Sequence, residues 1–268
     1  MALILNEEQQ SLKDIAKEFL QKNAPVTHFR EIRDTQNDLG YDETLWKEMV
    51  NLGWSGILIP EEYGGFNFGM VGMGSIFEEM GKTLTPSPLF STGVLGSSLI
   101  TLGGDDNQKQ KYLPQIVEGN LTTALALEEN SRHSPFTINT FAKKDGNSFK
   151  ISGNKTFVID GHSSDLLIVA ARTEGSNADI SGITLFLVDS DVDGVAIIQP
   201  VPLAMVVDFS LMDEGENVPV RIESWRGESL LPGVDIIDNW GMRLFQEIDL
   251  VANNFLSDSS LAETGRYD

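Results

Sequence analysis

The sequence of 268 residues predicts an α+β protein, with an all-α N-terminal domain over 1–120, an antiparallel β-barrel middle domain over 121–233 and an abbreviated C-terminal helical segment over 234–268. Two observations support this prediction. Apolar residues recur at helical spacing up to about residue 120, and short β-type runs bounded by turn residues follow. Because no helical pattern separates these runs, we expect an antiparallel barrel or sandwich rather than a doubly wound sheet.

Helices are expected throughout the first 120 residues. Asn6 can cap the first helix and Asp42 the second, because their side-chain oxygens can accept hydrogen bonds from the backbone N–H groups of a first turn. Glycine and proline mark helix ends, as at Gly53 and Pro86. In chain order, the expected helices cover about 7–22, 43–52, 73–80, 91–102 and 106–117.

Strands are expected after residue 120. In chain order, the β-type runs cover 122–127, 137–142, 149–152, 166–171, 183–188 and 195–198. Asp145-Gly146-Asn147 is typical of a hairpin turn between two of them. Further along, we expect a last strand at 218–222 and a helix rich in apolar side chains at 236–256.

Charge and composition exclude several classes of function. The chain has 40 acidic and 19 basic residues and a net charge of -21, so we expect neither nucleic acid nor a membrane surface as a partner. It has no cysteine, which excludes disulfides and cysteine-ligated zinc. No apolar run approaches the roughly 20 residues needed to cross a bilayer, and the first residues lack the basic flank of a secretory signal. A cytoplasmic location is therefore expected.

Four segments carry a resemblance to a known family. They are Ile59-Pro60-Glu61-Glu62-Tyr63-Gly64-Gly65, Tyr112-Leu113-Pro114, Gly153-Asn154-Lys155-Thr156-Phe157-Val158-Ile159-Asp160-Gly161 and Gly182-Ile183-Thr184-Leu185-Phe186-Leu187-Val188. From roughly residue 5 to 200 the chain resembles the acyl-CoA dehydrogenase family. Ser131-Arg132-His133 is more similar to a divergent branch that includes small subunits of pimeloyl-CoA-type dehydrogenases.

The resemblance implies a flavin-dependent oxidation. In the family, FAD takes a hydride from Cβ of an acyl-CoA thioester while a carboxylate removes the Cα proton, which gives a trans-2-enoyl-CoA. It also implies an acyl-CoA substrate and, by analogy, an electron-transfer flavoprotein as electron acceptor. The family's C-terminal helical bundle usually carries the base, and this chain has little room for it. We assign no base, because a solvated helix face is the simpler interpretation of Glu247 and Asp249.

The resemblance places a flavin site on two neighbouring segments. The family's Thr-Glu-Pro-x-Ala-Gly-Ser-Asp segment begins here at Glu128, so Leu127 and Glu128 are the expected flavin contacts and Ser134 is the expected contact near CoA. Phe157 and Ile159 are expected to flank the flavin ring, with Ile159 replacing a threonine hydroxyl. An ionised Glu128 that faces the electron-rich reduced flavin is unfavourable unless its carboxylate points away.

Plainer interpretations stay open for these residues. Phe157 and Ile159 could pack in the core of a strand, since alternating apolar residues need no cofactor to explain them. Glu128 and Glu129 could lie at a solvated strand end. His133 could be an ordinary loop histidine, because the chain has only three histidines and they are far apart in the sequence.

Three functions are consistent with the sequence. The chain could be a flavin-dependent acyl-CoA dehydrogenase or a subunit of one. It could instead be a non-catalytic paralogous subunit that supports a full-length acyl-CoA dehydrogenase without binding FAD. It could also be a truncated product with the ancestral fold and no activity. The apolar surface of the helix expected at 236–256 further predicts a homo- or hetero-oligomer.

Overall fold

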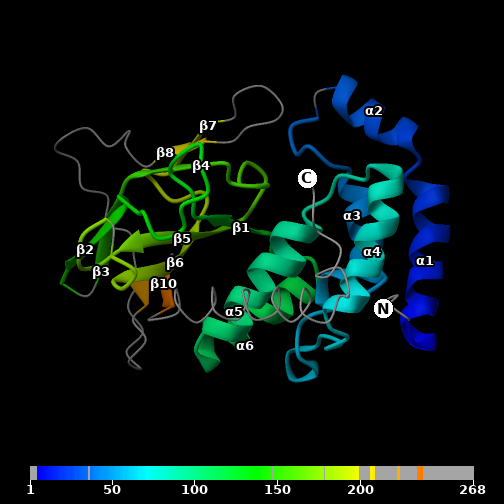
Figure 1. Ribbon diagram of the computed structural model, residues 1–268, viewed down its shortest axis with the longest axis horizontal. Helices are drawn as coiled ribbons and strands as arrows, with labels where there is room; N and C mark the ends of the chain where they lie inside the picture. Colours follow the sequence, from blue (N-terminus) through cyan, green and yellow to red (C-terminus); the bar gives the residue numbers. More distant parts are fainter. Residues whose placement is uncertain are drawn as a thin grey trace, which may run out of the picture.

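The protein has a mixed α+β fold in its computed structural model (Figure 1). The structure describes residues 5–35, 37–146, 148–177 and 179–198, together with the short strands at 206–208, 222–223 and 234–237. Figure 1 shows α1, α3 and α4 side by side at one end of the molecule, the strands at the other end, and α5 and α6 between them. None of the helices in the described part of the chain is both long enough and apolar enough to span a membrane.

The capping side chains predicted from the sequence are confirmed. Asn6 accepts a hydrogen bond from the Gln9 amide at 2.8 Å, and Asp42 accepts from the amides of Thr44 and Leu45 at 2.7 and 3.1 Å. These bonds satisfy backbone N–H groups that a first helical turn leaves free. The described α-helices are α1 (Glu7–Asn23), α2 (Val26–Asp34), α3 (Glu43–Asn51), α4 (Met70–Thr83), α5 (Ser97–Gly103) and α6 (Asp106–Val117).

Two helical segments differ from the prediction. Helix α2 was not expected, and Ile32 is its only buried residue. The helix expected at 91–102 is instead a π-helix, η3 (Leu89–Gly96), followed by α5. The π-helix packs against the first strand so closely that a Cβ on Gly96 would lie 1.8 Å from Thr123 Oγ1. The 3₁₀ turns are η1 (Trp54–Gly56) and η2 (Glu61–Tyr63).

A fully buried strand lies at the centre of the larger sheet. It is β5 (Leu166–Arg172), and it pairs antiparallel with β6 (Ile183–Asp189) over seven positions. The other edge of β5 pairs in parallel with β1 (Thr123–Ala126) and with the start of β2 (Phe141–Asp145). The remaining strands are β3 (Ser148–Ser152), β4 (Asn154–Thr156), β7 (Ala196–Ile198), β8 (Val206–Asp208), β9 (Ile222–Glu223) and β10 (Val234–Ile237).

The predicted antiparallel barrel is wrong. The larger sheet has the order β3-β2-β5-β6-β10-β9 with β1 on β5, and a second sheet has the order β4-β8-β7. Neither sheet closes through the strands that the structure describes. Pairing is mixed, because β1 and β2 run parallel to β5 and β9 runs parallel to β10. Apolar alternation reports which residues share a face but carries no information about strand direction, so the parallel pairs could not be read from the sequence.

Two further segments correct the prediction. Residues 137–140 of the strand expected at 137–142 form no strand, because the amides of Asn139 and Thr140 donate to the Glu129 carboxylate. Ile236 and Ile237 were expected to begin a helix, but they belong to β10, which pairs antiparallel with the apolar strand β6. The rest of the helix expected at 236–256 and most of the strand expected at 218–222 lie outside the described residues.

The helical part and the larger sheet share a hydrophobic core. Leu113 and Ile116 of α6 belong to the same buried cluster as Leu166, Ile168 and other residues of β5 and β6. A second cluster joins residues of β1, β2, β3, β5 and β6 to Val158, which follows β4, and Ile197 of β7 packs against it. A third cluster holds α1, α3 and α4 together. The shared core fixes the end of β1 relative to the helices, which is where the candidate site lies.

Candidate functional site

The structure brings together the two segments that the sequence assigns to a flavin site. Leu127 and Glu128 follow β1, and Phe157 follows β4. The Thr156 amide donates to the Glu128 carbonyl at 2.7 Å, and Lys155 Nζ donates to the Leu127 carbonyl at 3.1 Å. These two bonds align the end of β1 with the end of β4, although the segments are almost 30 residues apart in the sequence.

A buried ion pair underlies this junction. Glu129 Oε1 lies 2.8 Å from Lys155 Nζ, and both side chains are buried. The Thr140 amide also donates to Glu129 Oε1 at 2.8 Å, and the Asn139 amide donates to Oε2 at 2.7 Å. The interpretation of Glu129 as a solvated strand-end residue is therefore wrong. Its carboxylate is a buried acceptor that ties three segments together.

The pair perturbs both ionisable groups. Burial alone would raise the pKa of Glu129, but hydrogen bonds from Lys155 and Thr140 and the charge of Lys155 outweigh it and lower that pKa to about 2. Burial lowers the pKa of Lys155, and the hydrogen bond and charge of Glu129 oppose this effect. The arrangement is suited to holding the backbone rather than to moving a proton.

Glu128 is turned toward its own loop. Its Oε1 lies 2.5 Å from His133 Nδ1, and its Oε2 accepts from the Ser134 amide at 3.1 Å. Only 19% of its side chain is exposed, so the solvated strand-end interpretation is wrong for Glu128 as well. His133, by contrast, is 74% exposed and lies in a loop, as the plainer interpretation predicted. Ser134 Oγ donates to Thr137 Oγ1 at 2.7 Å and is half-buried.

Phe157 and Ile159 are both exposed apolar side chains, and we call this pair the apolar wall. Their exposed fractions are 54% and 51%, whereas Val158 between them is fully buried. Core packing is therefore the wrong interpretation of these two side chains. The chain leaves β4 through a left-handed residue, because Phe157 has φ +53°. This conformation is costly for a bulky residue and is found most often where a site constrains the backbone.

Asp160 connects the apolar wall to the helices, and sequence reasoning assigned it no role. It also has a left-handed backbone, with φ +58°. Ser91 Oγ of the π-helix donates to Asp160 Oδ2 at 2.6 Å. Burial raises the pKa of the Asp160 carboxyl, while the Ser91 hydrogen bond and the His162 charge act in the opposite direction.

Arg172 is a second important residue that sequence reasoning missed. In each hydrogen bond that the structure describes for it, the buried guanidinium donates to a backbone carbonyl. The acceptors, at 2.8–3.4 Å, are the carbonyls of Phe136, Ile138, Glu174, Asp179 and Ser181. It therefore joins the loop that follows Ser134 to the loop between β5 and β6. A charged residue at the end of an apolar run gave no sign of this role.

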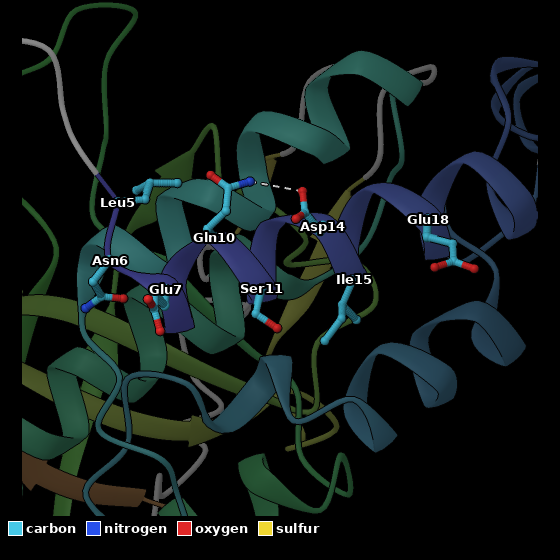
Figure 2. Close-up of a pocket in the computed structure, with 8 residues that line it drawn as sticks. All are labelled: Leu5, Asn6, Glu7, Gln10, Ser11, Asp14, Ile15 and Glu18. Carbon is cyan, nitrogen blue, oxygen red and sulfur yellow. Dashed lines mark hydrogen bonds between the residues drawn. The ribbon is translucent and has the colours of Figure 1, made fainter.

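A separate, shallow and open pocket of about 570 Å³ lies along α1 (Figure 2). Figure 2 shows Asn6, Asp14 and Glu18 on this helix, with Gln10 hydrogen-bonded to Asp14 at 3.0 Å. None of the candidate flavin or CoA residues lines it. Among the described residues, no group of three His, Asp or Glu side chains is arranged to hold a metal ion.

Known proteins share this architecture. The family model for the N-terminal domain of acyl-CoA dehydrogenases matches residues 6–120, and the model for the middle domain matches residues 124–212. Isovaleryl-CoA dehydrogenase, mitochondrial, of Pongo abelii is 32% identical over 203 residues, which cover 71% of this chain and 45% of that protein. The chain spans about half the length of the curated relatives it matches.

Solved structures give the same result. Butyryl-CoA dehydrogenase from Megasphaera elsdenii matches with a TM-score of 0.68 and 26% identity, over 78% of this chain and 57% of that one. The ChsE4-ChsE5 complex from Mycobacterium tuberculosis contains a chain that matches with a TM-score of 0.67, over 82% of this chain and 58% of that one; at 22% identity it shows the fold alone. From the two family models and these relatives, the chain belongs to the acyl-CoA dehydrogenase family.

Proposed function

We propose that the chain is an acyl-CoA dehydrogenase-like flavoprotein that acts in the α,β-dehydrogenation of an acyl-CoA thioester. One observation carries the proposal: Leu127 and Glu128 lie directly beside the segment that exposes Phe157 and Ile159. This is the pair of segments on which the family resemblance places the flavin. Ser134, six residues after Glu128, is the proposed contact near the CoA group.

The described residues fit a flavin ring. Phe157 and Ile159 offer an exposed apolar surface of the kind that an isoalloxazine face needs, and Lys155 and Glu129 hold the backbone behind it. The Glu128 carboxylate is engaged with its own loop and does not need to face the ring. Bound FAD would supply the hydride acceptor, and these residues would bind it, orient it and exclude water from one face.

A specific observation supports a second candidate, a non-catalytic subunit that supports a full-length acyl-CoA dehydrogenase. Ile159 has no hydroxyl to offer the flavin, and Glu128 stands where the family has threonine. Both substitutions remove polar contacts that tune a flavin. In this second function the same face would lie against a partner subunit without retaining FAD.

The proposed partners follow from the same reasoning. We propose an acyl-CoA substrate, an electron-transfer flavoprotein as electron acceptor and a homo- or hetero-oligomeric assembly, in which a full-length acyl-CoA dehydrogenase is the second subunit. Light scattering of the purified chain, alone and with such a subunit, tests this assembly.

Turnover distinguishes the two candidates. The chain, loaded with FAD and freed of unbound FAD, is incubated with isovaleryl-CoA or butyryl-CoA and an artificial electron acceptor, and enoyl-CoA is measured by chromatography. The dehydrogenase function predicts enoyl-CoA and a yellow protein. A colourless protein that forms no enoyl-CoA, but raises the activity or stability of a full-length dehydrogenase, would contradict it and support the second candidate.

A further inference from the structure

The Glu128 carboxylate is restrained on both of its oxygens by the loop that follows it. An ionised carboxylate only accepts hydrogen bonds, so the hydrogen in the 2.5 Å contact lies on His133 Nδ1. The Ser134 amide supplies the second bond, at 3.1 Å. Both donors come from residues that lie five and six positions after Glu128, and the loop therefore folds back over its own first side chain.

The neighbouring contacts limit where this carboxylate can go. The Thr156 amide holds the Glu128 carbonyl at 2.7 Å, next to Phe157 and the exposed wall. The next residue, Glu129, is paired with the buried Lys155, whereas the Glu128 carboxylate contacts only residues of its own loop in the bonds described. If the loop releases it, the carboxylate becomes a free negative charge at the edge of the apolar wall.

We propose that His133 is a positioning residue of the flavin site, which holds the Glu128 carboxylate against the loop so that the apolar wall beside it can accept an uncharged ring face. The inference rests on the proposed function. It explains how a chain with glutamate at this position retains a surface that fits a flavin. A free carboxylate would lose hydration without gaining a partner when an uncharged ring covers it, and it would repel the anionic pyrophosphate of FAD.

The test is the FAD dissociation constant, measured by quenching of flavin fluorescence, for the wild type, His133→Ala, Glu128→Gln and the double variant. We expect His133→Ala to weaken binding by about tenfold, the effect of one unfavourable charge at a partly screened distance. Glu128→Gln removes that charge, so the double variant should bind FAD within about twofold of Glu128→Gln alone. This rescue separates a charge-positioning role from a merely structural role of His133.

His28→Ala is the matched control. His28 is also a partly exposed histidine beside a carboxylate, since its Nε2 lies 3.4 Å from Asp42 Oδ2, but it belongs to α2, in the helical part. Its substitution should leave FAD binding unchanged. A double-mutant cycle of Glu128 and His133 in urea unfolding adds a readout without flavin, and it should show favourable coupling between the two residues.

The outcomes are separable. If the wild type and His133→Ala bind FAD with equal dissociation constants, the positioning role of His133 is overturned. The proposed function then stays intact. Equal weakening by His133→Ala in the wild-type and Glu128→Gln backgrounds would also overturn it, because the histidine would then act independently of Glu128. Absence of FAD binding in both the wild type and Glu128→Gln would overturn the inference together with the proposed function.

Discussion

Replacing Lys155 by methionine should remove most of the restraint on the β1–β4 junction. The substitution keeps an unbranched side chain but leaves Glu129 as a buried carboxylate without its cation. Breaking a buried pair from one side typically costs about 3–5 kcal/mol. The amides of Asn139 and Thr140 still donate to the carboxylate, so we expect the lower end, about 3 kcal/mol. The depressed pKa of Glu129, about 2, agrees in direction, because the hydrogen bond and charge of Lys155 are among its causes.

The assay is urea unfolding followed by tryptophan fluorescence, at pH 7 and at several lower values. The Glu129 pKa is lower in the folded protein, so its contribution is complete above the unfolded value near 4.5 and is lost as pH falls toward 2. Lys155→Met should therefore lower the unfolding midpoint strongly at pH 7 and by much less near pH 2. Lys150→Met is the control, because Lys150 pairs with an exposed Asp145, and its midpoint should change little.

Two results would refute this reasoning. If Lys155→Met and Lys150→Met shift the midpoint equally at pH 7, the buried pair does not restrain the junction. If the loss in Lys155→Met is the same at pH 7 and pH 2, it comes from packing and not from the charge of Glu129. The double variant Lys155→Met with Glu129→Gln should recover part of the stability, because a neutral amide oxygen can still accept from the Asn139 and Thr140 amides without leaving a buried charge.

Three other substitutions test separate parts of the structure. Arg172→Met should lower stability by at least about 2 kcal/mol in urea unfolding, because several buried carbonyls lose their donor, and an unchanged midpoint would contradict this role. Asp160→Asn should raise the thermal midpoint at pH 7 but not at pH 3. The pKa of Asp160 is raised in the folded protein, so ionisation of this carboxyl costs stability as pH rises. A lower midpoint of the variant at pH 7 would contradict this prediction. Gly96→Ala should lower the free energy of unfolding by about 1–3 kcal/mol, because the added methyl group would collide with Thr123. Gly74→Ala in α4 is the control, since its methyl group would meet open space and should be neutral or stabilising. Equal thermal midpoints for the two variants would contradict the close packing at Gly96.

Local features of the fold could be predicted from the sequence. Asn6 and Asp42 indicate the starts of α1 and α3, because a capping side chain accepts hydrogen bonds from backbone amides within the next three residues. The apolar runs in β5 and β6 are recognisable as buried strands for the same reason, since alternation and β-branched residues are local properties. Helix α2, which buries only Ile32, was not predicted.

Features that depend on distant partners could not be predicted. The parallel pairing of β1 with β5 depends on the hydrophobic core that they share with α6. The residues of this core come from several distant segments of the sequence. Glu129 resembles a solvated acid until Lys155 is seen 2.8 Å away, and Arg172 resembles a surface charge until the carbonyls around it are seen. The positions of the candidate flavin residues were predicted from the family resemblance, but their exposure and contacts required the structure.

Flavin retention by variants of the apolar wall tests whether Phe157 and Ile159 belong to a flavin site. Wild type, Phe157→Asp, Ile159→Asp and the control Phe141→Asp are loaded with FAD, freed of unbound FAD and compared by visible absorption. Phe141 is a suitable control because it is also about half exposed, at 52%, but lies on β2. The account predicts flavin bands in the wild type and Phe141→Asp and their loss in both wall variants. Equal retention in all four proteins, or none in the wild type, would contradict it.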